Sequence, residues 1–193
     1  MPFVVLDLEA GNELAQSLMG QLSLIIGQTF LTRFARYAFD LEQRAVFLYA
    51  DTVEAHGKPT LCLPNTLHAR VEKDGRVMDF VLDSGATGSS LASDYYRDFQ
   101  NEVLARGKWN ISGTAGYGGV SYNSVFIMPE VKLSIGSAPF ALNQVEVVAM
   151  SSRTNAFTRG YGRLGNDFLR QWGRVEIDNV NMLTTLTQKK TDK

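Results

Sequence analysis

The chain has 193 residues, of which 45% are hydrophobic and 20% are charged, as is typical of folded globular proteins. This length suits one large domain, or one and a half smaller ones. A formal net charge of −1 gives no electrostatic reason to expect nucleic acid or an anionic membrane surface as a partner. The single cysteine, Cys62, excludes an internal disulfide, and no window reaches the roughly 18 consecutive apolar residues of a membrane span. Residues 1–7 lack a signal-peptide pattern, so localisation is unknown, and export would require a signal that lies upstream.

The first fifty residues predict strands and one short helix. Residues 2–8 are rich in β-forming side chains and indicate a strand. Residues 29–34 indicate one or two helical turns, and residues 37–41 and 44–49 predict a hairpin. Residues 51–59 contain Gly and Pro and are the best linker candidate in the sequence.

A second series of strands begins beyond this linker. Residues 66–73 alternate in polarity, Asp74-Gly75 predicts a tight turn, and residues 77–82 return as the second strand of a hairpin. Residues 91–105 carry apolar side chains at near-helical spacing, which predicts one helix. A hairpin with a glycine-rich tip and two more strands should follow, at residues 110–114, 120–128, 131–135 and 144–150.

One stretch places a carboxylate directly after a buried strand. The apolar run 78–82 leads into Asp83, on a turn that contains Gly85. A carboxylate that loses water there needs hydrogen bonds, which backbone N–H groups freed by Gly85 and the hydroxyls of Ser84 and Thr87 can supply. Asp-Ser-Gly is also an ordinary turn sequence, and a tripeptide of this kind should occur by chance in roughly one such chain in ten. The assignment therefore depends on the rest of the chain.

The sequence contains an internal repeat. Residues 26–31 match residues 164–169 at a spacing of 138 positions. Further pairs keep this spacing: Arg36 with Arg174, Phe39 with Ile177, Asp40 with Asp178, and Leu48 with Leu186. Pro2-Phe3 and Pro139-Phe140 match at nearly the same spacing. The first copy ends near residue 49, whereas the second begins near residue 60, so the first corresponds to the last third of a unit whose complete form follows it.

Taken in order, these features resemble the pepsin-like and retropepsin-like aspartic proteases. In that family each lobe begins with a hairpin into Asp-Thr/Ser-Gly, continues with a flap hairpin, and closes with two apolar residues, Gly, a short helix and a strand pair. Residues 60–187 resemble this whole order, with residues 113–122 as the flap. Residues 163–169 stand at the closing segment, where Arg163 departs from the apolar pattern that residues 25–27 match better. The resemblance implies an all-β fold, an acid-protease β-barrel lobe with short helices.

The resemblance also implies a division of the chain. Residues 1–50 would be the closing portion of a truncated first lobe, 51–59 a linker, 60–187 a complete lobe, and 188–193 a disordered tail. The first copy has no Asp-Ser/Thr-Gly. A second carboxylate would therefore come from missing upstream sequence, or from a second molecule of the chain across a twofold axis.

The activity that this resemblance implies is peptide-bond hydrolysis by an activated water. Two neighbouring carboxylates share one proton, so that the charged one takes a proton from water while the neutral one donates to the scissile carbonyl. Asp83 would supply one carboxylate of this pair. The supporting residues would be Ser84, Gly85 and Thr87 in the catalytic turn, and Tyr117, Gly118 and Gly119 in the flap that binds substrate. The mechanism requires no metal and no cofactor, and the expected partners are a peptide or protein substrate and the second lobe.

Other readings of the sequence are weaker. The runner-up is a protease-like domain that binds peptide or a partner subunit without cutting it. Residues 160–165 match G-x-G-x-x-G, but a polar loop precedes them and Gly173 cuts short the helix that a nucleotide site needs. His56 and His68 have no ligand partners at metal-binding spacing, and neither is placed to activate Ser84 as a nucleophile.

Three other aspartates are expected to be structural. Asp40 and Asp178 lie at predicted strand ends, where they would form turns. Asp167 follows Asn166 and is expected to begin a helix rather than to act as the second acid.

Overall fold

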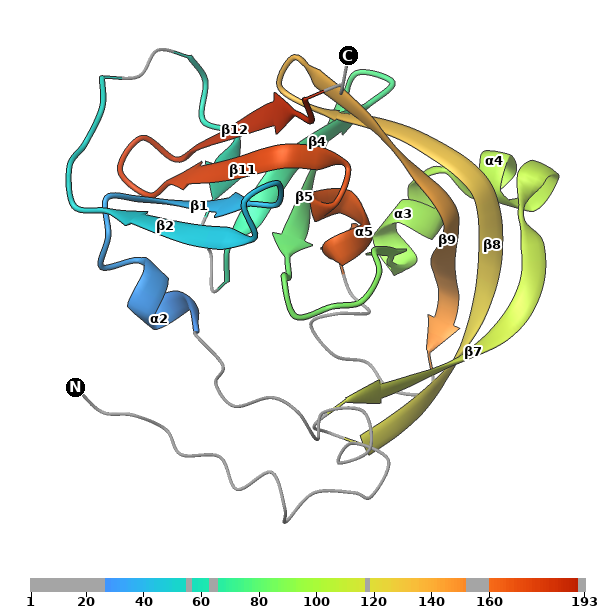
Figure 1. Ribbon diagram of the computed structural model, residues 1–193. Helices are drawn as coiled ribbons and strands as arrows, with labels where there is room; N and C mark the ends of the chain where they lie inside the picture. The colour runs from blue at the N-terminus through green and yellow to red at the C-terminus, as the bar shows by residue number, and fades with distance from the viewer. Residues whose placement is uncertain (1–26, 55–56, 63–65, 117–118, 152–159, 191–193) are drawn as a thin grey trace.

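The fold is predominantly β, and its helices are short (Figure 1). The computed structural model describes residues 27–54, 57–62, 66–116, 119–151 and 160–190. Within these ranges the strands form two sheets, one of four strands and one of eight. No helix in the described parts of the chain is long and apolar enough to cross a membrane. The strand predicted at residues 2–8 lies outside the described residues.

The four-stranded sheet joins the two ends of the described chain. From edge to edge its strands are β12 (Leu183–Gln188), β11 (Trp172–Asp178), β1 (Arg36–Asp40) and β2 (Ala45–Tyr49). Every neighbouring pair is antiparallel. The hairpin predicted at 37–49 is confirmed as β1 and β2.

The eight-stranded sheet forms the larger lobe. In order, its strands are β3 (Leu61–Cys62), β4 (His68–Lys73), β5 (Arg76–Leu82), β10 (Gly162–Leu164), β6 (Ser90–Leu91), β9 (Ala138–Ser151), β8 (Gly119–Ile135) and β7 (Lys108–Gly116). The predicted hairpin of β4 and β5 is confirmed, and Asp74 and Gly75 both adopt the positive φ of a tight hairpin turn. The sheet is mixed, because β10 runs parallel to β5 and β6 runs parallel to β9.

Two details differ from the sequence-based expectation. The single helix predicted at 91–105 is two helices, α3 (Ser93–Asp98) and α4 (Gln100–Arg106), because Phe99 between them leaves the helical conformation at φ −118° and ψ 26°. The strands predicted at 120–128 and 131–135 are one strand, β8. Its pairing with β9 continues on both sides of Pro129, so proline does not end the strand.

The core of the larger lobe lies between its sheet and these short helices. Buried side chains from β5, β6, β9, β10 and the helices meet there, among them Phe80, Leu91, Tyr95, Val147, Leu164 and Phe168. Strands β7, β8 and β9 curve together along one side of the lobe (Figure 1). The four-stranded sheet packs at the opposite side, next to the short helices α2 (Gln28–Leu31) and α5 (Asn166–Leu169).

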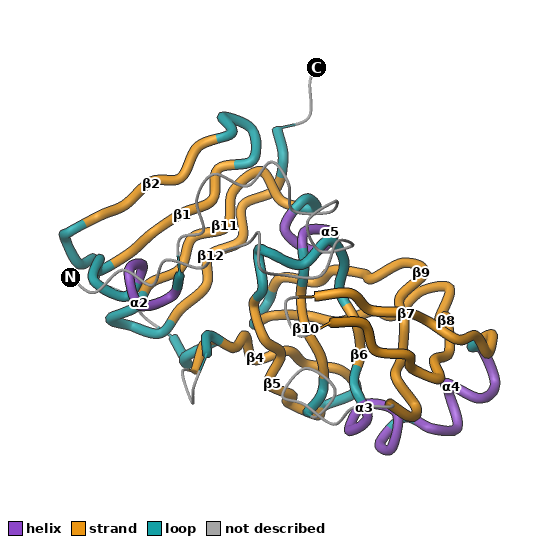
Figure 2. The backbone as a smooth tube through the Cα atoms, turned by 90° about the horizontal axis from the view of Figure 1, so that it is seen from below, coloured by secondary structure: helices purple, strands orange, loops and turns teal. Residues whose placement is uncertain are grey.

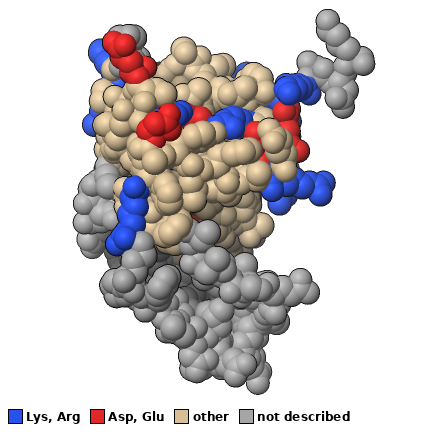
Figure 3. All heavy atoms as spheres, turned by 60° about the vertical axis from the view of Figure 1, so that its left-hand side comes forward, with Lys and Arg blue, Asp and Glu red and all other residues tan. Residues whose placement is uncertain are grey.

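The outer face of the four-stranded sheet carries paired charges. Arg36 donates to Glu176 at 2.7 Å, and Arg174 donates to the other oxygen of the same carboxylate at 2.9 Å. The Arg36 guanidinium also lies over the Tyr49 ring, 4.6 Å from its centroid. On the side of the molecule shown in Figure 3, basic and acidic side chains are likewise interspersed rather than gathered by sign.

In this sheet, the two copies of the internal sequence repeat are related by an approximate twofold axis. Strands β1 and β11 pair antiparallel about Ala38 and Glu176, two residues that themselves differ by the repeat spacing of 138. Antiparallel neighbours that are copies of each other are related by a twofold rotation about the centre of their pairing. We refer to residues 27–49 as the first repeat and to residues 165–187 as the second repeat.

The two repeats have matching local structure at their short helices and at their hairpin turns. Helices α2 and α5 have the same length, and each follows an extended glycine, Gly27 or Gly165. The left-handed residues of the two hairpins, Arg44 at φ 54° and Met182 at φ 55°, also correspond. The similar structure predicted for 26–27 and 164–165 is therefore found at the glycine, while residue 26 lies outside the described residues.

The aspartates of the two hairpins form turns, as predicted. Asp40 Oδ1 accepts a hydrogen bond from the Gln43 backbone N–H at 2.8 Å. Its counterpart Asp178 Oδ1 accepts one from the Asn181 backbone N–H at 2.7 Å. Because Gln43 and Asn181 also differ by 138 positions, the repeat extends to individual side-chain contacts.

Candidate functional site

The candidate site is a loop that crosses the end of a central strand. Strand β10 lies between β5 and β6, as Figure 2 shows, so the loop from β5 to β6 must pass over the end of β10. Because β5 and β10 are parallel, the chain leaves both strands at the same end of the sheet, at Asp83 and at Gly165. The loop that carries Asp83 therefore lies against the segment that begins the second repeat.

Asp83 itself is held by backbone groups. Its Oδ1 accepts a hydrogen bond from the Gly85 N–H at 3.1 Å, as the turn sequence predicts. The Asp83 N–H donates to the Leu164 carbonyl at 3.0 Å, and the Ala86 N–H donates to the Asp83 carbonyl at 3.1 Å. The side chain remains 29% exposed, so the carboxylate is anchored and still accessible to a ligand.

The side chain of Arg163, which departs from the apolar pattern of the closing segment, lies beside the Asp83 carboxylate. Arg163 Nη1 is 3.6 Å from Asp83 Oδ2, and the Arg163 side chain is 24% exposed. Arg163 pairs with Val81 across β10 and β5, so its side chain lies on the face of the sheet from which Asp83 follows, just beyond the end of β5. The side chains of a strand point alternately to its two faces, so the direction of Arg163 could have been inferred from the sequence. Arg163 precedes the buried Leu164 and must point to the opposite face.

Asn166 holds the Asp83 turn from the second repeat. Its backbone N–H donates to the Ala86 carbonyl at 2.9 Å. Its side-chain Nδ2 donates to the carbonyl of Ser84, the residue after Asp83, at 3.0 Å. These two bonds connect the turn to the start of helix α5.

Asp167 adds a third connection. Asp167 lies in the first turn of α5, as predicted, but its Oδ1 also accepts hydrogen bonds from the Ser89 backbone N–H at 2.7 Å and the Ser89 hydroxyl at 2.6 Å. The Ser89 hydroxyl oxygen in turn accepts from the Gly165 N–H at 3.0 Å. A Cβ on Gly165 would come within 2.6 Å of the Gly88 backbone, so the close contact requires glycine.

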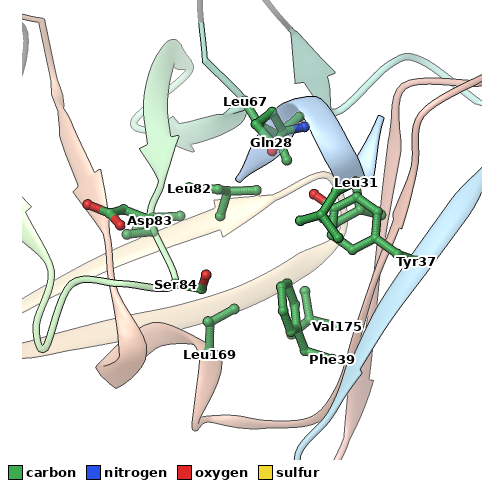
Figure 4. Close-up of a pocket in the computed structure, with 12 residues that line it drawn as sticks. Gln28, Leu31, Tyr37, Phe39, Leu67, Leu82, Asp83, Ser84, Leu169 and Val175 are labelled. Atoms are coloured by element: carbon green, nitrogen blue, oxygen red, sulfur yellow. The ribbon is translucent and has the colours of Figure 1, made fainter. Parts of the chain in front are cut away.

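A small cavity lies beside Asp83 and Ser84 (Figure 4). Its volume is about 40 Å³, enough for two or three waters. Three pairs of lining residues differ by the repeat spacing: Leu31 with Leu169, Tyr37 with Val175, and Phe39 with Ile177. The cavity therefore lies on the approximate twofold axis, and Asp83 is next to that axis.

The polar groups around the cavity differ in their surroundings. The Tyr37 and Ser84 hydroxyls point into it, whereas the Asp83 carboxylate points away from the apolar lining (Figure 4). Burial raises the pKa of Tyr37 to about 12, so this phenol is neutral at physiological pH. The side chain of Gln28, in the first repeat, also lines the cavity. Within the described ranges, no group of three or more His, Cys, Asp or Glu side chains is arranged to hold a metal ion.

The other predicted site residues lie on the Asp83 turn, at the start of β8, or outside the described residues. Ser84 and Thr87 are exposed on the turn, and Gly85 supplies the N–H that holds Asp83. Gly119 begins β8 opposite Gly116, which agrees with the predicted hairpin of β7 and β8. Tyr117 and Gly118 lie outside the described residues, so their position as a flap over Asp83 stays a prediction.

Known proteins do not extend these observations. No family model matches the chain, and the curated proteins contain no match to it. The geometry around Asp83 is therefore the main indication of function.

Proposed function

We propose that the chain is part of an aspartic peptidase of the pepsin-like or retropepsin-like kind, in which Asp83 supplies one of two catalytic carboxylates. The single observation that supports this most is the position of Asp83 beside the cavity on the approximate twofold axis. A carboxylate beside a twofold axis has its symmetry-related position close by. A second lobe with the same turn would therefore bring a second carboxylate near the first.

The proposed reaction follows from such a pair. Two carboxylates in close contact share one proton, because both cannot remain ionised so near each other. The charged member takes a proton from a water, which attacks the scissile carbonyl carbon, while the neutral member donates its proton to the carbonyl oxygen. Collapse of the resulting tetrahedral intermediate breaks the C–N bond, and the departing amine takes up a proton. The connections from Gly85, Asn166 and Asp167 would hold Asp83 in position during these steps.

A second candidate function has its own support. The charged neighbour of Asp83 among the described residues is Arg163, a cation rather than a second acid. An Asp–Arg pair cannot share a proton in the way that two carboxylates can. This observation favours the runner-up, a protease-like domain that binds peptide or a partner subunit without cleaving it.

A peptide-cleavage assay at acid pH separates these functions. It should be run on this chain and on a form extended upstream, with pepstatin-like inhibition as a control. Asp83→Asn should reduce cleavage roughly 10³-fold or more while leaving thermal unfolding unchanged, because Asn is nearly isosteric but cannot exchange the shared proton. The matched control is Asp79→Asn, since Asp79 is an exposed aspartate on β5, the strand that leads to Asp83. Full cleavage by Asp83→Asn would refute the peptidase proposal, and peptide binding without cleavage by either unmodified form would support the runner-up.

A further inference from the structure

We propose that Arg163 makes the Asp83 site selective for peptides that carry an acidic side chain next to the bond lying over Asp83. The inference rests on the proposed function, because it names the class of peptide that the same site takes. Its basis is the place of Arg163 in the eight-stranded sheet and the distance of its guanidinium from Asp83.

Arg163 belongs to a row of side chains that crosses the sheet on the face away from the core. From β5 across β10 and β6 to β9, the paired residues are Val81, Arg163, Ser90 and Glu146. Paired residues of neighbouring strands point to the same face, and all four of these are half-buried. Leu164 and Leu91, which follow Arg163 and Ser90 along their strands, are fully buried on the other face. The row is therefore the polar and charged side of this part of the sheet.

Arg163 is the cation of this row that lies at Asp83. Its Nη1 is 3.6 Å from Asp83 Oδ2, which is longer than a hydrogen bond, and its side chain is 24% exposed. An arginine presents five N–H donors in a planar fork, so it can contact two carboxylates at once. A bidentate pair between a guanidinium and a carboxylate is among the stronger polar contacts in proteins. Arg163 can therefore receive the carboxylate of a ligand beside that of Asp83.

The anion of the row lies farther from Asp83. Glu146 is two strands away from Arg163, which corresponds to roughly 10 Å between their Cα atoms. Its Oε1 accepts a hydrogen bond from the Ser112 hydroxyl at 2.7 Å. The row is therefore positive next to Asp83 and negative farther along the same face.

A peptide whose scissile bond lies over Asp83 brings the flanking side chains within reach of Arg163. In the proposed reaction, the attacking water and the scissile carbonyl occupy the catalytic carboxylates. A neighbouring side chain then meets the charge of Arg163, which attracts a carboxylate and repels an ammonium group. Glutamate next to the bond should therefore bind better than glutamine, and lysine should bind worse.

Peptide binding can test this inference without requiring cleavage. The probes are fluorescein-labelled, end-capped peptides of alanine, valine and phenylalanine that carry glutamate, glutamine or lysine at the centre. Their binding is measured by fluorescence anisotropy at about pH 6, where the peptide glutamate is ionised. We expect the 193-residue chain to bind the glutamate peptide roughly tenfold more tightly than the glutamine peptide, and the lysine peptide more weakly than either.

Variants of Arg163 connect the preference to this side chain. Arg163→Gln should bring the affinities for the glutamate and glutamine peptides to within about twofold of each other, because it removes the cation. Arg163→Lys keeps the charge beside Asp83 but loses the fork, so it should reduce the preference to about threefold, and it decides the question if Arg163→Gln does not fold. The matched control is Arg76→Gln, which should keep the full preference. Arg76 also pairs with an aspartate, Asp98, but at the other end of β5, roughly 20 Å along the strand.

The outcomes separate this inference from the peptidase proposal. Equal binding of the glutamate and glutamine peptides, absence of binding to all three peptides, or a full preference in both Arg163 variants would overturn the inference. Asp83-dependent cleavage without a preference for glutamate would uphold the peptidase proposal and overturn the inference. An Arg163-dependent preference in binding without any cleavage would uphold the inference and overturn the peptidase proposal.

Discussion

The two repeats have the same backbone but different surroundings. In the second repeat, the loop from Asp83 to Ser89 packs directly on Gly165, Asn166 and Asp167. In the first repeat, the space at Gly27 is open, and Phe30 is exposed on helix α2. The helix and hairpin of each repeat therefore form from local sequence, whereas the contacts that hold the Asp83 turn require segments distant in the chain.

The glycines before the two helices should give the largest contrast. Gly165→Ala forces a Cβ against the Gly88 backbone, and we expect it to lower the free energy of unfolding by about 3 kcal/mol. Gly27→Ala should change it by less than about 0.5 kcal/mol in the same chain. Chemical denaturation of both variants measures the difference. Equal losses would mean that the open space at Gly27 does not exist in solution.

The next residue pair tests the link between the second repeat and the Asp83 loop. Asp167→Ala removes the acceptor of two hydrogen bonds from Ser89, and we expect a loss of about 2 kcal/mol in unfolding free energy. Its counterpart in the first repeat is Thr29, which is exposed, so Thr29→Ala should have almost no effect. A small loss for Asp167→Ala would show that the loop is held mainly by other contacts.

A third pair of variants, in the two hairpin turns, should have similar effects on stability. Asp40→Ala and Asp178→Ala each remove a carboxylate that caps a hairpin turn by accepting a backbone N–H. We expect both to lower the unfolding free energy by similar amounts, about 1 to 2 kcal/mol. Urea denaturation of the two variants in parallel gives the comparison. A clearly larger cost at one site would break the equivalence of the two hairpins.

Tyr37 should give the smallest effect, and only at alkaline pH. Burial raises its pKa from 10.0 to about 12, whereas its counterpart Val175 has no ionisable group. A group whose pKa is raised on folding stabilises fully below its unfolded pKa and loses that contribution as the pH rises towards its folded pKa. The unmodified chain should therefore lose about 1 kcal/mol more than Tyr37→Phe between pH 9 and pH 11.

The control for this measurement is built into the comparison. Burial also raises the pKa of Tyr95, but that residue is present in both proteins, so its contribution cancels. Parallel stability curves for Tyr37→Phe and the unmodified chain over this pH range would contradict the burial of Tyr37.

Much of the local structure could be predicted from the sequence. Alternating polarity and the Asp74-Gly75 turn were sufficient for the hairpin of β4 and β5, because strand pairing across a two-residue turn depends on neighbouring residues. The repeat likewise placed α2 and α5 at equivalent positions. The break at Phe99 was missed, because near-helical spacing of apolar side chains continued through it.

The candidate site was predictable only in part. Asp83 and the Gly85 N–H that holds it are neighbours in sequence, and the turn chemistry identified both. The bond from Ser89 to Asp167 joins residues 78 positions apart, so no local pattern could reveal it.

By itself, the sequence determined the β-rich character of the chain, its repeat of 138 positions and the turn that presents Asp83. These properties depend on backbone preferences and side-chain alternation, which act over a few residues. The tertiary structure decided that β10 lies between β5 and β6, that Arg163 lies beside Asp83, and that the Asp83 loop packs on the second repeat. Those outcomes depend on which distant segments meet, and two nearly equivalent sequences can differ there because packing partners, rather than local preferences, determine what each one contacts.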